Sequence, residues 1–279
     1  MPELPEVETI RLGLQKYIVG KTIKDVEVRL KKIVSGDPKD IIGAKVVDVR
    51  RFGKGLVIDL DNGYSITSHI KLTGQFVYRD SKTAKFKISP KVGKEIPNKF
   101  THVIFKLDNG IVYYNDVRQF GWIKIIQSSK LKDQSFFNEL GPEFFKDLTF
   151  DKFLETISRA KGPIKPLLMD QKKMSGVGNI YANDALFDAK IDPRRSAKQI
   201  SDEEIKKLYN AILKVLKKGL EQGGASELNY VNVLGQEGGY QNHFLVYGRE
   251  KEPCRVCKTP IQKIKLGGRG TYFCSKCQK

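Results

Sequence analysis

The sequence has few of the residues that define several large classes of protein. Only four of its 279 residues are cysteine, three are histidine and one is tryptophan, so it is no disulfide scaffold. No apolar run approaches the ~18 residues of a membrane span. The first ten residues have neither the basic n-region nor the apolar h-region of a signal peptide. We therefore expect no membrane segment and a cytoplasmic location.

Acidic residues are also scarce relative to basic ones. The chain has 50 Lys and Arg against 32 Asp and Glu, which gives a formal net charge of +18. Excess positive charge attracts polyanions over long distances, and nucleic acid is the commonest of them. An anionic membrane surface is the alternative, but the basic residues are spread along the chain and not gathered in one helix. The charge favours a nucleic-acid partner.

The length predicts about two domains, and the hydrophobic content of 40% is enough for a core in each. Residues 6–18 are predicted to form a helix, because apolar residues recur there at helical spacing: Val7, Ile10, Leu14 and Ile18. Residues 22–127 read as strands, with Asn-Gly turns at 62–63 and 109–110 that predict two hairpins. Helical periods return over 132–222. The pattern indicates a β-rich N-terminal domain followed by a helical middle.

Two segments are predicted to lack regular structure. Residues 80–99 have many lysines, two prolines and little apolar content, which is typical of a solvated loop. Residues 224–243 are rich in Gly, Asn and Gln, which indicates a mobile loop. Between them, Ser201 and Glu204 form a capping-box signature at the start of a helix that Gly223 ends.

The cysteines form a C-x2-C pair at Cys254 and Cys257 and a second pair at Cys274 and Cys277. This spacing fits four thiolates around one zinc ion, held tetrahedrally. Two disulfides are the alternative, but a cytosolic chain disfavours them. We expect one structural Zn²⁺ per chain in a C-terminal hairpin.

The N-terminus combines a nucleophile with a carboxyl group. Removal of Met1 gives Pro2 a free secondary amine, and an α-amino group with a pKa of about 7.7–8.0 is partly neutral at pH 7. A neutral amine attacks an aldehydic carbon and forms a Schiff base, and Glu3 is adjacent as a proton donor. The alternative is that Pro2 and Glu3 merely lead into the first helix.

At this point the sequence resembles the formamidopyrimidine-DNA glycosylases, bacterial enzymes that excise oxidised purines. The stretch M-P-E-L-P-E-V-E-T at residues 1–9 looks like the start of that family. Further segments resemble its motifs in order along the chain: R-F-G-K at 51–54, H-I-K-L-T-G at 69–74, D-V-R-Q-F-G at 116–121, S-G-V-G-N-I-Y-A at 175–182, V-Y-G-R at 246–249, C-R-V-C at 254–257 and G-R-G-T-Y-F-C at 268–274.

The resemblance implies an α+β fold: an N-terminal β-sandwich with an N-terminal helix, a helical domain with a helix–two-turn–helix motif, and a zinc-finger β-hairpin. It implies domains at 1–130, 131–243 (with a lesion-capping loop) and 244–279. The implied function is a base-excision-repair glycosylase and abasic-site lyase with β,δ-elimination, which removes oxidised purines (8-oxoguanine and formamidopyrimidines) from double-stranded DNA through a Schiff base at the N-terminal proline. The implied protein is a monomer in the bacterial cytoplasm, associated with the nucleoid.

The resemblance also implies residue roles. Pro2 is the nucleophile that attacks the deoxyribose C1′, Glu3 is the general acid, and Lys54 and Arg269 complete the catalytic set. Residues expected to contact DNA are Glu6, His69, Leu72, His102, Arg118, Phe120, Lys161, Asn179 and Tyr247. From the residues alone, alternatives stay open: Lys54 as a solvated lysine, His102 as a strand histidine, Arg118 in a surface ion pair, Phe120 as a core aromatic, and Asn179 and Arg269 in plain turns.

The sequence departs from the family's pattern at three positions. Leu72 replaces the usual Met, Gln119 replaces the second Arg of R-R-F-G, and Phe100 replaces a frequent His. None of these touches Pro2 or Glu3, so they put lesion search and opposite-base preference in doubt and leave the chemistry intact. Two other functions remain: an oxidised-pyrimidine glycosylase of the sister branch, against which Leu4 argues, and a non-catalytic, zinc-containing protein that binds damaged DNA.

Overall fold

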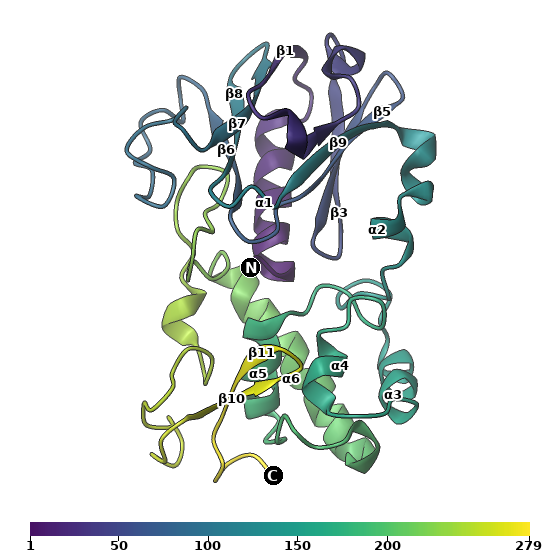
Figure 1. Cartoon of the computed structure of the whole chain (residues 1–279), viewed down its shortest axis with the longest axis vertical. Coiled ribbons are helices and arrows are strands. Elements are labelled where there is room, and N and C mark those ends of the chain that lie inside the picture. The colour runs from purple at the N-terminus through teal and green to yellow at the C-terminus, as the bar shows by residue number, and fades with distance from the viewer. The chain divides into compact units, whose positions relative to one another are not determined.

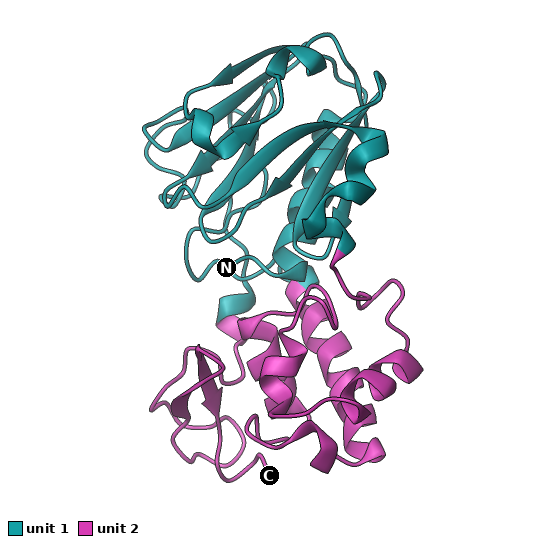
Figure 2. Cartoon of the chain, turned by 45° about the vertical axis from the view of Figure 1, so that its right-hand side comes forward, with its two compact units in different colours: residues 1–138, 220–241 teal, residues 139–219, 242–279 magenta.

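The computed structural model describes residues 1–279, and the chain forms two units (Figures 1 and 2). Unit 1 comprises residues 1–138 and 220–241, and unit 2 comprises residues 139–219 and 242–279. The chain therefore leaves unit 1 and returns to it for one short segment, which contains the predicted lesion-capping loop.

Unit 1 begins with helix α1 (Leu4–Ile18), which starts slightly earlier than the predicted residue 6. Pro5 lies in its first turn, where the absence of an N–H costs no hydrogen bond. The four apolar residues of the predicted stripe are all buried: Val7, Ile10, Leu14 and Ile18. The predicted helix is confirmed, and its apolar face joins the core of the unit.

The strands of unit 1 form two sheets, with orders β1-β7-β8-β6 and β2-β9-β5-β4-β3. All neighbours are antiparallel except β2 and β9. The strands are β1 (Ile23–Val28), β2 (Val34–Ser35), β3 (Val46–Phe52), β4 (Gly55–Leu60), β5 (Tyr64–His69), β6 (Gly74–Arg79), β7 (Thr101–Leu107), β8 (Ile111–Asp116) and β9 (Trp122–Gln127). Short helical turns complete the unit: η1 (Lys31–Ile33), η2 (Pro38–Ile41), η3 (Ser128–Asp133) and α2 (Ser135–Asn138).

Both predicted hairpins are present. β4 pairs with β5 around Asn62-Gly63, and β7 pairs with β8 around Asn109-Gly110. Gly63 and Gly110 have φ angles of 81° and 103°, a region that glycine enters without a steric penalty. The Asn-Gly pattern therefore predicted both turns correctly, but it could not predict the strand order of the two sheets.

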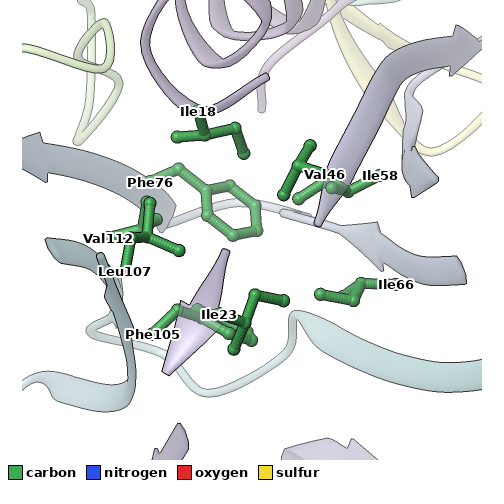
Figure 3. Close-up of a pocket in the computed structure, with 9 residues that line it drawn as sticks. All are labelled: Ile18, Ile23, Val46, Ile58, Ile66, Phe76, Phe105, Leu107 and Val112. Atoms are coloured by element: carbon green, nitrogen blue, oxygen red, sulfur yellow. The ribbon is translucent and has the colours of Figure 1, made fainter. Parts of the chain in front are cut away.

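The core of unit 1 lies between the sheets and takes in the apolar face of α1 (Figure 1). Figure 3 shows the ring of Phe76 pointing into a small gap among aliphatic side chains of both sheets. The gap is about 10 Å³, and its lining is wholly apolar. A site of that size and character does not hold an ordered water. The sandwich interior is thus a dry core and not a binding site.

The remaining helices and the C-terminal hairpin lie in unit 2, except that α6 ends and η5 begins within residues 220–241 of unit 1: α3 (Phe150–Ser158), α4 (Ile164–Leu168), α5 (Asn179–Asp188), η4 (Ala197–Gln199), α6 (Asp202–Glu221), η5 (Tyr240–His243), β10 (Gln262–Leu266) and β11 (Arg269–Phe273). The predicted capping box is confirmed, because the Ser201 N–H donates to Glu204 Oε2 at 3.0 Å. The α+β fold predicted from the sequence is confirmed. No helix has the length and apolar content needed to cross a bilayer.

The two predicted loops have no helix or strand apart from η5 at the end of the second, but both contain buried residues and neither is wholly solvated. In 80–99, Thr83, Ser89 and Val92 are buried. In 224–243, Val231 is wholly buried, and Val92 and Val231 join one apolar cluster. The composition was misleading because a few apolar residues among many lysines are enough to pack one loop against the other.

Candidate functional site

The N-terminus of α1 places two carboxyl groups in a buried position. Pro2 is buried, and Glu3 and Glu6 are 2% and 1% exposed. The Glu3 N–H donates to Glu6 Oε2 at 2.7 Å, which is one half of a capping box. Cap geometry thus fixes the backbone of Glu3 directly after Pro2, so the sequence-predicted nucleophile and acid share one rigid helix start.

Glu6 also holds the segment that the sequence marks as the capping loop. Its Oε1 accepts the Ala225 N–H at 2.8 Å. Gly224 has a φ of +85°, and a Cβ there would lie 2.8 Å from the Tyr230 ring and 2.9 Å from Glu6 Cγ. Only glycine fits this position. The structure therefore brings the loop against the end of α1 that carries Pro2 and Glu3.

Lys54 lies in the tight turn between β3 and β4 and is 4% exposed. The turn is fixed by Arg51, whose Nη1 donates to the Gly53 carbonyl at 2.9 Å and whose Nε donates to Glu8 Oε2 at 2.7 Å. Since Glu8 belongs to α1, this ion pair ties the turn to the same helix. Lys54 is thus held in place by its neighbours and is not the solvated lysine of the alternative interpretation.

His69, at the end of β5, is neutral. Burial lowers its pKa to about 3, with the charges of Lys71 and Lys54 as further causes. Its Nδ1 accepts the Lys71 N–H at 2.9 Å, so the neutral ring carries its proton on Nε2. The ring packs edge-on against Phe136 at 5.0 Å. A neutral imidazole with one N–H is a hydrogen-bond donor whose charge does not change near neutral pH.

The loop after β8 presents an arginine and an aromatic ring to solvent. Buried Asp116 fixes its two ends, because its carboxylate accepts the N–H groups of Arg118 at 3.2 Å and Gly121 at 2.7 Å. Phe120 is 56% exposed, and the Arg118 guanidinium lies 4.9 Å from its ring centroid. Phe120 is therefore not a core aromatic, and the structure records no ion pair for Arg118. Leu72 is partly buried.

His102 lies within β7 and is 5% exposed. Its Nε2 is 2.8 Å from the Asp116 carbonyl oxygen. This position fits the strand-histidine alternative, and a contact between His102 and DNA stays a prediction. The neighbouring Phe100 is partly buried, and Lys99 lies 5.1 Å from its ring centroid.

In unit 2, Asn179 begins α5 and links it to the C-terminal hairpin. Its Nδ2 donates to the Gly270 carbonyl at 3.1 Å, and its Oδ1 accepts from Lys165 Nζ at 2.6 Å. Lys165 is 1% exposed and donates as well to Thr271 Oγ1 at 2.8 Å. Sequence reasoning missed Lys165, because nothing local in the sequence shows that residues 165, 179 and 271 meet.

Three other residues of unit 2 singled out by the sequence lie at or near the surface. Arg269 and Lys161 are exposed, and Tyr247 is partly buried with its ring 5.3 Å from that of Tyr272. The backbone before Tyr247 is fixed by Asp184 of α5, whose Oδ1 accepts the Val246 and Tyr247 N–H groups at 3.0 and 3.1 Å. Sequence reasoning also missed Asp184, whose partners are distant in the chain.

The four cysteines form one cluster. The Sγ atoms of Cys254 and Cys277 are 3.9 Å apart, those of Cys257 and Cys274 are 3.3 Å apart, and all four lie within 4.8 Å of one another. Tetrahedral zinc with Zn–S bonds of about 2.3 Å places its sulfurs about 3.8 Å apart. The donor set therefore fits one structural zinc ion, and all four ligands predicted from the spacing are brought together.

Comparison with protein families matches almost the whole chain. Residues 1–123 match the formamidopyrimidine-DNA glycosylase N-terminal domain, and residues 140–229 match the formamidopyrimidine-DNA glycosylase H2TH domain. Residues 251–279 match the zinc finger found in FPG and IleRS.

Similar proteins span the chain from end to end. Formamidopyrimidine-DNA glycosylases of Streptococcus mutans and Listeria monocytogenes are 40% and 39% identical to it over 286 aligned positions, covering 100% of both chains in each case. The crystal structure of MutM (FPG) from Thermus thermophilus has a TM-score of 0.87 at 33% identity, covering 99% of this chain and 98% of that one. Lactococcus lactis Fpg, in complex with DNA containing an abasic site, has a TM-score of 0.87 at 32% identity and covers 99% of each chain.

Proposed function

Since the chain belongs to the formamidopyrimidine-DNA glycosylase family, we propose that it removes oxidised purines from duplex DNA in base excision repair. Its substrates on this proposal are 8-oxoguanine and formamidopyrimidines. One observation carries the proposal: Pro2 and Glu3 are buried together at the capped end of α1, where Glu6 binds the Ala225 N–H of residues 222–241, the segment that contains the predicted lesion-capping loop. A nucleophile and an acid in that position are of no use to a protein that only binds DNA.

The proposed chemistry starts at Pro2 once Met1 has been removed. The neutral secondary amine attacks the deoxyribose C1′, and the bond from C1′ to the base breaks with its electron pair leaving on the base; the Pro2 nitrogen loses its proton, and the departing base takes one up. Glu3 protonates the sugar ring oxygen as the C1′–O4′ bond opens, which gives an iminium between Pro2 and C1′. The iminium draws electrons from C2′, so a C2′ proton and then the 3′ phosphate leave. A second elimination expels the 5′ phosphate, and water releases the sugar fragment from Pro2.

Other residues are assigned to holding the DNA. We propose that Lys54 neutralises a phosphate near the lesion and assists proton transfer. We also propose that His69 donates its Nε2–H to the DNA backbone. Lys161, Asn179, Tyr247 and Arg269 are proposed phosphate contacts in unit 2, with Asn179 at a helix N-terminus as phosphate sites often are. Glu6 and His102 are also proposed to lie at the DNA. Glu6 would act through the segment whose Ala225 N–H it binds, and His102 would act beside the loop that follows Asp116.

The target base has to leave the helix before Pro2 can reach C1′. We propose that Phe120 and Leu72 fill the space that the base vacates and that Arg118 faces the orphaned cytosine. The exposure of Phe120, and its contact with the Arg118 guanidinium, support this role. Apolar wedges of this kind offset an unstacking cost of a few kcal/mol.

Zinc has a structural place in this proposal. Four thiolates leave no open coordination position for water, so the ion takes no part in the reaction. Cys254, Cys257, Cys274 and Cys277 would hold it and thereby order the hairpin that carries Arg269.

We also propose that 1–130, 131–243 and 244–279 act as three functional parts of one monomer, and that the protein works in the bacterial cytoplasm at the nucleoid.

The direct test is strand incision. Purified protein is mixed with end-labelled duplexes that contain 8-oxoguanine opposite cytosine, an oxidised pyrimidine, or no lesion. We expect cleavage at 8-oxoguanine that leaves phosphate on both sides of a one-nucleotide gap, and an intact undamaged strand. The oxidised-pyrimidine arm matters because Lactococcus lactis Fpg has been solved with such DNA. Preference for that arm would favour the sister activity, and binding without cleavage would favour a damage-binding protein.

Salt dependence provides a prediction about the DNA contacts. Each cation that neutralises a phosphate contributes a slope of about −0.9 to log K against log salt. With Lys54, Lys161 and Arg269 as contacts, we expect a slope of about −3 for undamaged duplex, and Lys161→Ala should make it shallower by about 1. Fluorescence anisotropy between low and moderate salt measures this slope. A flat plot contradicts the assignment of all three residues.

A further inference from the structure

The 80–99 segment is bonded to the 222–241 segment by a charged cluster. Lys91 Nζ donates to Glu237 Oε2 at 2.8 Å, and Ser89 Oγ donates to Glu237 Oε1 at 2.6 Å. The Ser89 N–H donates to the Gly235 carbonyl at 2.7 Å. Both oxygens of one carboxylate are therefore held by a segment more than a hundred residues away in the chain.

The contact extends beyond the ion pair. Lys91 Nζ donates as well to the Ser226 carbonyl. The Nε2 of Gln75, which is 2% exposed, donates to the Lys91 carbonyl at 3.0 Å and to the Asn229 carbonyl at 2.5 Å. An apolar cluster formed by Val77, Val92 and Val231 lies in the same contact. Main chain, charge and packing thus join the two segments together.

This contact continues to the reacting end of α1. The Ser226 carbonyl is bonded to Lys91, and the preceding Ala225 N–H donates to Glu6 Oε1. The other oxygen of Glu6 accepts the Glu3 N–H. Three hydrogen bonds, joined by the backbone of Ala225–Ser226 and the carboxylate of Glu6, therefore connect Lys91 to the backbone of Glu3, with every link inside unit 1.

The charged pair is not buried. The side chains of Lys91 and Glu237 are 26% and 38% exposed, so an isolated pair would contribute little. Here each charged group has further partners: Lys91 also reaches the Ser226 carbonyl, and Glu237 accepts from Ser89. Lys91 and then Ser89 lower the pKa of Glu237, so its carboxylate stays ionised at neutral pH.

We propose that Lys91 and Glu237, with Gln75 and Ser89, form a clamp that keeps the 222–241 segment folded over α1 before DNA binds, and that Lys91 and Glu237 are positioning residues for recognition of the damaged base. The inference rests on the proposed function, because it assigns that segment to the extruded base. The clamp is expected to matter only for substrates in which the damaged base is still attached to the sugar, because the loop can cover such a base. An abasic site offers no base, so its cleavage does not need the clamp.

The test uses the full-length protein and two substrates, a duplex with 8-oxoguanine and a duplex with a preformed abasic site. In Lys91→Met and in Glu237→Gln we expect kcat/KM on 8-oxoguanine to fall about tenfold, as for loss of one hydrogen bond to a charged group. Most of that loss should appear in KM. Cleavage of the abasic duplex should stay within twofold of wild type, and Lys91→Arg should restore excision.

Hydrogen exchange gives a readout that does not depend on activity. In the free wild-type protein the Ala225 and Ser226 amides should be protected, because both N–H groups are bonded to side chains. In Lys91→Met they should exchange about tenfold faster. Lys94→Met is the matched control, since it removes one exposed lysine from the same segment and should change neither exchange nor kinetics.

Several results overturn the clamp. Folded Lys91→Met with wild-type excision shows that the contact has no role in base recognition. An equal loss on both substrates, with a lower melting temperature, shows a structural role only. Unprotected Ala225 and Ser226 amides in the wild type show that the loop is not held at all. If the wild-type protein cleaves neither duplex, the proposed function fails, and exchange alone still decides whether Lys91 holds the loop.

Discussion

Replacing Pro2 with glycine is expected to remove most of the covalent complex that sodium borohydride traps between the protein and a duplex containing 8-oxoguanine. Proline provides a secondary amine, whose adduct with C1′ is an iminium that has no proton on nitrogen to lose and therefore stays charged until C2′ is deprotonated. Glycine provides a primary amine, whose imine must be protonated before it can withdraw electrons. It also lacks the ring that fixes the backbone before the buried Glu3. Both changes weaken the electron sink on which excision and elimination depend.

The measurement is a denaturing gel of the reduced mixture, with removal of Met1 confirmed by mass spectrometry. Undamaged duplex controls for non-specific reduction. Pro38→Ala, in the first turn of η2, controls for loss of a proline outside the site and should trap like wild type. An undiminished adduct in Pro2→Gly would show that trapping requires neither the secondary amine nor the ring of Pro2. Tight binding with no adduct in the wild type would leave only a damage-binding protein.

Glu3→Gln separates the acid from the nucleophile in the same assay. Loss of a positioned general acid typically costs about 10²–10⁴-fold, so excision of 8-oxoguanine should fall within that range. An abasic sugar opens to its aldehyde spontaneously, so the variant should still be trapped on a preformed abasic site. The same side chain change therefore affects one substrate and spares the other, which a general loss of folding cannot do.

Sequence patterns predicted the features that depend only on residues close together in the chain. The Asn-Gly turns, the Ser201 capping box and the cysteine pairs each depend on residues close together in the chain, and each is found in the structure. The α1 stripe is of the same kind, because helical periodicity alone places its residues on one face. Pro2 and Glu3 are adjacent in the sequence, so their proximity could be predicted, and their chemical roles stay a prediction.

Contacts between distant segments were not predictable in this way. Lys165 stands between prolines in a short helix, and only the folded chain shows its ammonium among Asn179, Gly270 and Thr271. Similarly, the lysine-rich composition of 80–99 predicted a solvated loop, although Lys91 reaches Glu237 across 146 positions of sequence. Composition indicates whether a segment as a whole tends to be solvated. It does not show that one residue, such as Lys91, has a distant partner that holds the segment in place.

Removal of zinc is expected to unfold the C-terminal hairpin and weaken DNA binding, while the sandwich of unit 1 stays folded. The hairpin has two short strands, and its apolar cluster consists largely of the cysteines themselves with Phe187, Val246 and Ile261. A segment that small rarely folds on its core alone. Structural zinc contributes about 10–16 kcal/mol of apparent binding free energy in such modules, more than the stability of many whole domains.

The loss should spread from the metal to Asn179. Without an ordered β11, Lys165 loses the Gly270 carbonyl and the Thr271 hydroxyl, and Asn179 loses the acceptor of its Nδ2. A buried ammonium without its partners is costly, so the start of α5 should rearrange as well. Two proposed phosphate contacts, Arg269 and Asn179, therefore depend on one ion that touches neither.

Cys257→Ser tests this dependence, with bound zinc measured in the same preparation. Wild type should carry one zinc per chain; the variant should carry little, bind duplex DNA more weakly and show a salt slope shallower by about 1 for the lost Arg269 contact. Val256→Ala is the matched control, because Val256 lies beside Cys257, is 70% exposed and is no ligand. Far-ultraviolet circular dichroism should retain the strand signal of unit 1. Full DNA affinity in metal-free protein would show that the hairpin holds its shape without zinc, and the link from Cys257 to Arg269 and Asn179 would be wrong.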